Sequence, residues 1–129
     1  MNENYRFLSE EDILYIHNNQ INLYGGESGI RSQELLNSAV SHVRTEFAGV
    51  KLYKNLIEIA SAYIYHICQN HCFIDGNKRT ALVAGLVFLN LNGFDILDPE
   101  EKLYQMMLDI TEGKIGKSEI QKILGQLAN

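Results

Sequence analysis

The chain of 129 residues contains no tryptophan, one proline and two cysteines. So few cysteines exclude a small fold held together by disulfides, and the scarcity of proline excludes a collagen-like chain. The two thiols fit a reducing compartment, so we expect a cytoplasmic protein. The longest strongly apolar run, residues 81–91, is about half of what spans a bilayer, and the polar residues 1–6 carry no targeting pattern. We therefore expect no membrane partner.

Positive charge is also scarce. Eleven Lys and Arg stand against sixteen Asp and Glu, which gives a formal net charge of -5. A protein that binds nucleic acid regardless of its sequence needs a basic surface, so no direct nucleic-acid partner is expected. The length fits a single domain over residues 1–129, because a chain of this size removes roughly two-thirds of its surface from water on folding.

Apolar residues recur at helical spacing along most of the chain. Ser9 followed by Asp12 has the spacing of a capping box, which predicts a helix start. Further starts are expected at Ser32, at residues 98–101 and at Ser118. These patterns predict an all-α fold, a compact helical bundle.

The middle of the chain predicts two more helices, over residues 56–69 and 80–92. The second is apolar on nearly every face, and a helix without a polar face is usually surrounded by other helices. We therefore expect residues 80–92 to form the buried central helix. The helical period fails over residues 44–52, where we expect a short β-hairpin or an extended flap.

Polar side chains are densest over residues 71–80, with the sequence HCFIDGNKRT. The first N–H groups of the helix that follows have no partner inside it. Those donors, the helix dipole, Lys78 and Arg79 predict a phosphate site. Asp75 is a candidate Mg²⁺ ligand, and His71 is a candidate base, because an imidazole can take up a proton near neutral pH. Together they describe a nucleotide-dependent phosphoryl or nucleotidyl transferase.

The same side chains have an ordinary structural interpretation. His71 is then a loop or core residue, Asp75 a helix cap, and Lys78 with Arg79 a solvated first turn. Cations near a helix N-terminus are disfavoured by ~0.3–1 kcal/mol each, so two in succession suggest a bound anion. From the residues alone both interpretations stay open.

Residues 71–80 resemble the signature of the Fic/Doc superfamily, His-x-Phe-x-Asp/Glu/Asn-Gly/Ala-Asn-Lys/Gly-Arg. The Lys-Arg-Thr ending resembles the Doc (death-on-curing) branch, toxins of bacterial and phage toxin–antitoxin pairs. The similarity extends over roughly residues 8–124, for example in residues 29–31 and 88–93. It implies a single helical bundle of the Fic/Doc type.

The resemblance also implies a role for each motif residue. His71 matches the catalytic base, Phe73 the aromatic anchor of the loop, and Asp75 the Mg²⁺-binding acid. The residues that match an anion site for the phosphates of ATP supply backbone, amide and cationic groups: Gly76, Asn77, Lys78 and Arg79.

Superfamily members carry a flap before the third helix that holds the target chain by strand addition. Phe47 and Val50 are therefore candidate docking residues, with an ordinary inter-helix loop as the alternative. Arg31 is expected to be an exposed helix-start arginine, with support of the site as the alternative. His17 and His42 are expected to be surface or interfacial residues.

Lys78 and Leu82 depart from the AMP-transferring Fic pattern, which has Gly and a second Arg at these positions. The Doc branch shares both departures and implies a kinase that transfers a phosphoryl group from ATP, with Mg²⁺, to a hydroxyl of a translation factor, elongation factor Tu being the precedent. Protein synthesis and growth would then stop. AMP transfer to a protein hydroxyl is the alternative, and a catalytically idle antitoxin-binding or co-repressor module is the second alternative.

The family's internal inhibitory helix carries a Glu four residues after a Ser or Thr, and no Ser or Thr in this chain has one there. The resemblance therefore implies a separate inhibitor, a small antitoxin whose disordered tail folds onto this domain. Any operator binding is then expected of the antitoxin.

Overall fold

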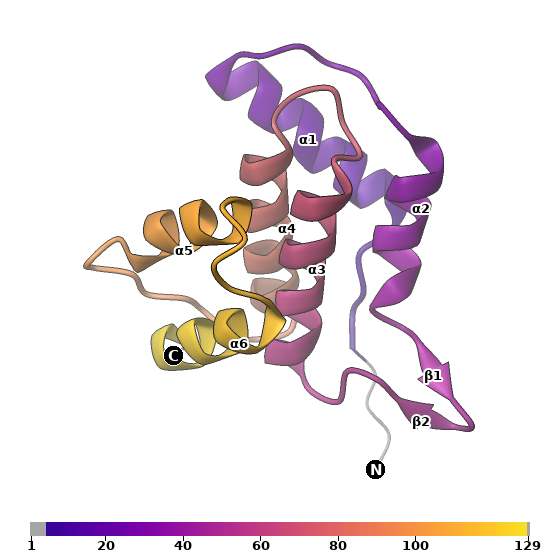
Figure 1. Ribbon diagram of the computed structural model, residues 1–129, viewed down its shortest axis with the longest axis vertical. Coiled ribbons are helices and arrows are strands. Elements are labelled where there is room, and N and C mark those ends of the chain that lie inside the picture. The colour runs from indigo at the N-terminus through magenta and orange to yellow at the C-terminus, as the bar shows by residue number, and fades with distance from the viewer. Residues whose placement is uncertain (1–4, 129) are drawn as a thin grey trace.

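The computed structural model describes residues 5–128. Within them the chain forms six helices and one short hairpin (Figure 1). In chain order the elements are α1 (Glu10–Tyr24), α2 (Gln33–His42), β1 (Glu46–Phe47), β2 (Val50–Lys51), α3 (Leu56–Asn70), α4 (Asn77–Leu91), α5 (Lys102–Thr111) and α6 (Lys117–Leu127). The mostly helical fold and the hairpin are confirmed.

Two of the expected helix starts are capped as the sequence predicts. The Ser9 Oγ accepts a hydrogen bond from Asp12 N at 3.1 Å, and Asp12 Oδ2 accepts one from Ser9 N at 2.8 Å. Ser32 Oγ likewise accepts from Leu35 N at 3.2 Å. Each side chain satisfies a backbone N–H that has no partner inside its own helix, so it fixes where α1 and α2 begin.

The two C-terminal helices begin elsewhere than expected. α5 starts at Lys102, after residues 98–101, because the Asp98 carboxylate reaches across that turn to accept from Lys102 N at 2.7 Å and from Leu103 N at 2.9 Å. α6 starts at Lys117, so Ser118 lies inside the first turn and is not the cap. Glu119 Oε1 accepts from Gly116 N at 2.8 Å instead.

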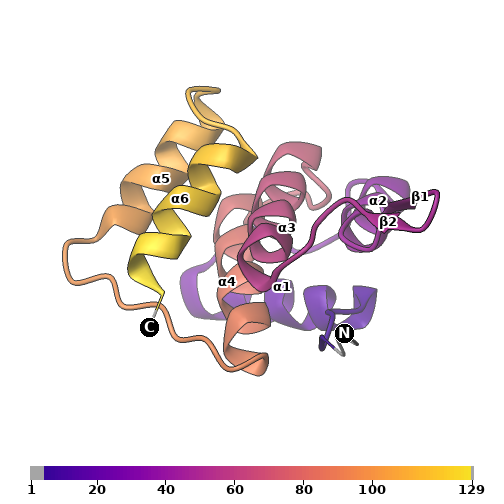
Figure 2. The same ribbon diagram turned by 90° about the horizontal axis from the view of Figure 1, so that it is seen from below.

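The central helix is α3, which corrects the prediction for residues 80–92. α3 packs against α2, α4, α5 and α6, whereas α4 packs mainly on α3 and α1. Figure 2 shows α5 and α6 on one side of α3, with α2 and the hairpin on the other. One side of α4 is in tight contact: a Cβ added at Gly85 would lie 2.5 Å from Ile64 of α3. Apolar side chains on its other side are only half-buried: Leu82, Val83, Leu86 and Val87.

The hairpin and the loop after α3 lie at opposite ends of that helix (Figure 1). α3 has 15 residues, which at 1.5 Å per residue separates its ends by about 22 Å. Among the described residues, no helix is both long and apolar enough to cross a membrane.

Candidate functional site

Residues 71–76, here called the motif loop, join α3 to α4. His71 follows the last turn of α3 in the left-handed conformation, with φ 50°. Arg31 holds this turn: its Nε donates to His71 O at 2.6 Å and its Nη2 donates to Asn70 O at 2.9 Å. Arg31 is exposed, as expected, and it also supports the site by capping the C-terminus of α3.

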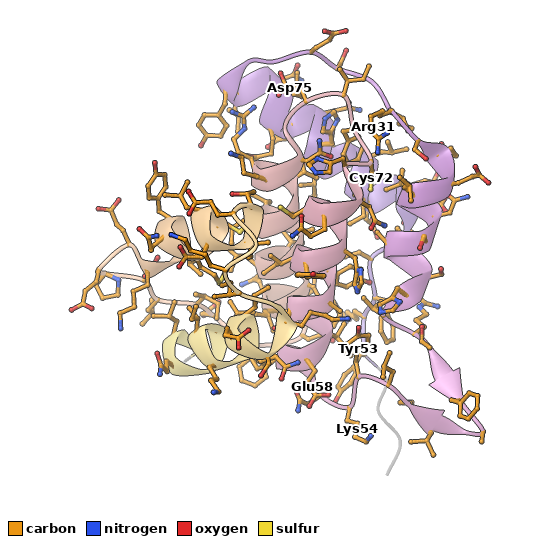
Figure 3. The ribbon with its side chains drawn as sticks, viewed as in Figure 1. Arg31, Tyr53, Lys54, Glu58, Cys72 and Asp75 are labelled. Carbon is orange, nitrogen blue, oxygen red and sulfur yellow. The ribbon has the colours of Figure 1, made fainter. Side chains whose placement is uncertain are left out.

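The α1–α2 loop pairs with the motif loop along its length. Arg31 N donates to Cys72 O at 2.7 Å, and Ile74 N donates to Gly29 O at 3.1 Å. These bonds form an isolated antiparallel bridge between Ile30 and Phe73. In Figure 3, Arg31, Cys72 and Asp75 lie together at this end of the molecule. The backbone of one loop therefore fixes the backbone of the other.

Asn77 closes the motif loop from within. Its Oδ1 accepts from Phe73 N and its Nδ2 donates to Phe73 O, both at 2.9 Å. The side-chain amide is therefore engaged with the loop, which departs from the expectation that it binds the anion. What Asn77 offers an anion is its backbone N–H, in the first turn of α4.

The ring of Phe73 is buried, and it is stacked on His17 of α1 with the ring centroids 3.8 Å apart. His17 is itself only 1% exposed, and its Nε2 lies 2.8 Å from Asp75 O. His17 is thus buried between α1 and the motif loop and not exposed at the surface, which corrects the expectation for this residue. No local sequence pattern points to this contact, because the two residues come from segments far apart in the chain.

The carboxylate of Asp75 is exposed and accepts two backbone hydrogen bonds. Oδ2 accepts from Glu27 N at 3.2 Å, and Oδ1 accepts from Gly76 N at 2.8 Å. The bond from Glu27 first, and that from Gly76 second, hold the pKa of Asp75 below its ordinary value. Gly26 permits this approach: its φ is +118°, and a Cβ there would lie 2.8 Å from Asp75 Oδ2.

One open groove, of about 390 Å³, brings the predicted site residues together. It is lined by the candidate base, the candidate metal ligand and the predicted anion-binding residues: His71, Asp75, Gly76, Asn77, Lys78 and Arg79. Thr111, at the end of α5, forms another part of the wall, and sequence reasoning missed it because only the packing of α5 beside α3 places it there.

The groove is electropositive at the N-terminus of α4. Gly76 has no side chain with which to cap this helix, and no side chain of the described residues does so. Lys78 is exposed, and within residues 5–128 neither it nor Arg79 is within ion-pair distance of a carboxylate. Open amides, a helix dipole and two such cations form a site suited to phosphate.

Arg79 is held in part by the α1–α2 loop. Its Nη2 donates to Gly25 O at 2.8 Å, and its guanidinium lies 5.5 Å from the centroid of the Tyr24 ring. Its Nε is buried and has no hydrogen-bond partner among the described residues. The orientation of the guanidinium is thus fixed while part of its hydrogen-bonding capacity stays unused.

Asp75 also passes a simple test as a Mg²⁺ ligand. Within residues 5–128 no group of three acidic, His or Cys side chains is placed to hold a metal by itself. Mg²⁺ is commonly bound by one or two carboxylates together with substrate phosphates and water. A single exposed and ionised carboxylate beside a phosphate site fits that pattern.

The structure does not bring the candidate docking residues to this groove. Phe47 and Val50 are 85% and 58% exposed on the hairpin, at the other end of α3. Their exposure leaves both side chains accessible, and their role in target docking stays a prediction. Any contact that they make with a target lies about one length of α3 away.

Comparison with known proteins agrees with the motif. The model of the Fic/DOC family matches residues 7–89. The chain is 30% identical over 122 residues to protein kinase doc of Escherichia phage P1, which covers 95% of each chain. It is 36% identical over 90 residues to Toxin Doc of Mycolicibacterium smegmatis, which covers 70% of this chain and 67% of that protein.

Proposed function

Because the chain belongs to the Fic/DOC family, we propose that it is a Doc-like toxin that transfers the γ-phosphoryl group of ATP to a hydroxyl of a translation factor. The names of its relatives, a protein kinase and a toxin, support the two halves of this proposal. The observation that carries it is the groove that His71 and Asp75 line together with the uncapped N-terminus of α4.

The anion site would hold the triphosphate. The backbone N–H groups at the start of α4 donate to phosphate oxygens, and Lys78 and Arg79 neutralise charge. Such preorganised donors usually make the largest contribution in phosphoryl transfer, because charge builds up on the phosphate oxygens during the reaction. Mg²⁺, held by Asp75 and by the phosphates, would add Lewis-acid stabilisation of the same charge.

His71 would act as the general base. Its ring takes the proton of the acceptor hydroxyl as the bond from that oxygen to the γ-phosphorus forms. The bond from the γ-phosphorus to the bridging oxygen breaks, and ADP leaves with the electron pair. Proton transfer of this kind contributes typically 10²–10⁴-fold to the rate. Arg31 keeps the backbone of His71 in place at the rim of the groove.

Lys78 is the feature that favours phosphoryl over AMP transfer. Its bulk and charge at the start of α4 would make ATP dock with the γ-phosphate nearest His71. AMP transfer to a protein hydroxyl is the alternative, and transfer of differently labelled ATP decides between the two.

A small antitoxin with a disordered tail is the proposed inhibitor. The name of the relative Toxin Doc supports a partner of this kind. The tail would fold onto the chain when it binds. Operator binding would belong to that partner, in keeping with the net charge of -5 on this chain.

The test is incubation of the purified chain with Mg²⁺, purified elongation factor Tu, and either γ-labelled or α-labelled ATP. We expect only the γ label to be transferred, with a mass gain of about 80 Da on the target, the size of a phosphoryl group. Transfer of the α label, with a gain of about 329 Da, would establish AMP transfer instead. If neither label reaches this target or any protein of a bacterial lysate, the proposed activity is wrong. Lys122→Met, which removes an exposed lysine of α6, serves as the control variant and should transfer label as the wild type does.

A further inference from the structure

We infer that His17 is a positioning residue for the transfer reaction: from α1, it fixes the motif loop so that the Asp75 carboxylate stays at the groove. This inference deepens the proposed function and rests on it. His17 lies outside the groove, so it acts on the reaction only through the motif loop.

His17 holds the motif loop at two points. Its ring stacks on Phe73 with an interplanar angle of 6° and a centroid distance of 3.8 Å. Its Nε2 lies 2.8 Å from the carbonyl oxygen of Asp75. A carbonyl can only accept, so Nε2 carries the proton and donates. One buried ring thus fixes both the anchor of the loop and the backbone of the candidate metal ligand.

The other contacts of Asp75 are weaker supports. They come from the backbone N–H groups of Glu27 and Gly76, and both bonds are solvent-exposed. Exposed loop segments with few buried contacts open locally at low free-energy cost. His17, in contrast, is 1% exposed on a helix of 15 residues whose buried side chains include Ile13 and Ile16. Of the three groups that bond to Asp75, His17 is therefore the most rigidly placed.

Two variants separate the two contacts of His17. His17→Phe keeps a flat ring for stacking on Phe73 but removes the donor to Asp75. His17→Gln removes the ring but keeps an N–H donor. Ile13→Val, in the buried face of α1 and with a side chain that cannot hydrogen-bond to the loop, controls for a general loss of packing.

Positioning through the donor predicts a specific order. For His17→Phe, the Mg²⁺ concentration for half-maximal transfer should rise about 10-fold, the usual size of effect when a ligand loses the group that orients it. His17→Gln should lie closer to the wild type, and Ile13→Val should match it. A role in packing alone predicts the opposite order, with His17→Gln the more damaged variant.

The test combines two measurements on the full chain. The first is the Mg²⁺ dependence of ATP binding and of label transfer. The second is amide hydrogen exchange, by NMR, at Glu27 and Gly76, whose N–H groups donate to Asp75. We expect faster exchange at both amides in His17→Phe than in Ile13→Val, with or without nucleotide.

The outcomes distinguish this inference from the proposed function. If wild-type protein neither binds ATP nor transfers label, the proposed function fails, and exchange that is nevertheless faster in His17→Phe would still support the positioning contact. If wild-type protein is active and His17→Phe has its Mg²⁺ dependence and exchange unchanged, the inference is overturned while the function stands.

Discussion

Two clusters of basic side chains lie beside α3, and they differ in how their charges are satisfied. At the end of α3, Lys78 and Arg79 face a groove, and neither is within ion-pair distance of a carboxylate in the described chain. Along the flank of α3, Lys117 donates to the Tyr53 hydroxyl at 2.6 Å and lies 3.0 Å from His66 Nε2. Its ammonium is also 5.2 and 5.7 Å from the ring centroids of Tyr53 and Tyr65.

The polar groups of the flank cluster (His42, Tyr53, Tyr65, His66 and Lys117) hydrogen-bond mainly to one another. An ammonium can only donate, so His66 Nε2 accepts and is unprotonated. His42 Nε2 and the Tyr53 hydroxyl are 2.6 Å apart. Burial first, then the nearby charge of His42 and Lys117, lower the pKa of His66 to about 4. Burial and Lys117 lower the pKa of His42 as well.

The contrast shows how a binding site differs from a structural cluster of the same residue types. In the flank cluster the donors already have acceptors, so a ligand gains nothing there. At the groove, no side chain caps the first amides of α4, and among the described residues no carboxylate lies within ion-pair distance of Lys78 or Arg79. The following predictions test this difference.

The largest effect is expected from His71→Ala. His71 is exposed and lines the groove, so the loss of its ring should leave folding and most ATP binding intact. Transfer should fall by about 10²–10⁴-fold, because no base remains to accept the proton. Single-turnover transfer of label, alongside ATP titration, measures the two properties. Transfer at the wild-type rate would remove His71 from the mechanism.

A matched pair of lysine variants tests the comparison itself. Lys78→Met should weaken ATP binding by about 10–100-fold, the worth of a hydrogen bond to a charged group, with little change in stability. Lys117→Met should leave ATP binding unchanged and destabilise the fold by about 1–3 kcal/mol, because Tyr53 and His66 lose their donor. Calorimetric titration with ATP measures the affinity of each variant, and urea unfolding measures its free energy of unfolding. Equal effects of the two variants on ATP binding would contradict the distinction.

Two glycines with positive φ offer a smaller but sharper test. Gly26→Ala and Gly49→Ala should each cost roughly 1–2 kcal/mol of stability, because L-residues disfavour this conformation. Only the new Cβ in Gly26→Ala would clash with the Asp75 carboxylate, because a Cβ at Gly49 meets nothing within 4 Å. We expect the Mg²⁺ requirement for transfer to rise about 10-fold in Gly26→Ala alone. A rise in both variants would mean that the hairpin, too, shapes the site.

The smallest effect concerns pH. The unfolded chain binds a proton at His66 below its ordinary pKa of 6.5, whereas the folded chain does so only near pH 4. The unfolded state therefore binds more protons in this window, and stability should fall as the pH drops from 7 to 5. In His66→Asn the fall should be smaller. Urea unfolding at pH 7 and pH 5 compares the two slopes, and an identical slope would show that His66 does not carry the effect.

Much of this fold is readable locally. Ser9, Ser32 and the glycines at the end of α1 predict element ends, because a cap or a turn depends on residues within about four positions. The predicted start of α5 was wrong because the Asp98 carboxylate caps across a longer turn than the usual pattern. The prediction that α4 is the central helix was also wrong, because apolar composition does not say which sides of a helix have a neighbour. The central helix is α3.

The features of the site also divide into those that local sequence predicts and those that depend on tertiary packing. His71, Asp75, Lys78 and Arg79 fall within nine consecutive residues, so their proximity at one groove is predictable from their spacing in the chain. The contacts of His17 and Gly26 with the motif loop join positions separated by about fifty to sixty residues, and only tertiary packing creates them. The hairpin with Phe47 precedes α3 and the motif loop follows it, so their separation by one helix length follows from the order of the predicted elements.

The most direct measurement is an NMR titration of the labelled chain with ATP and Mg²⁺, which reports both clusters in one experiment. We expect saturable shifts of the backbone amides of residues 75–80, at the start of α4, and little change at Tyr53, His66 and Lys117. Shifts centred on the flank cluster, or none at saturating ATP, would contradict the claim that the open charges of this groove form a triphosphate site.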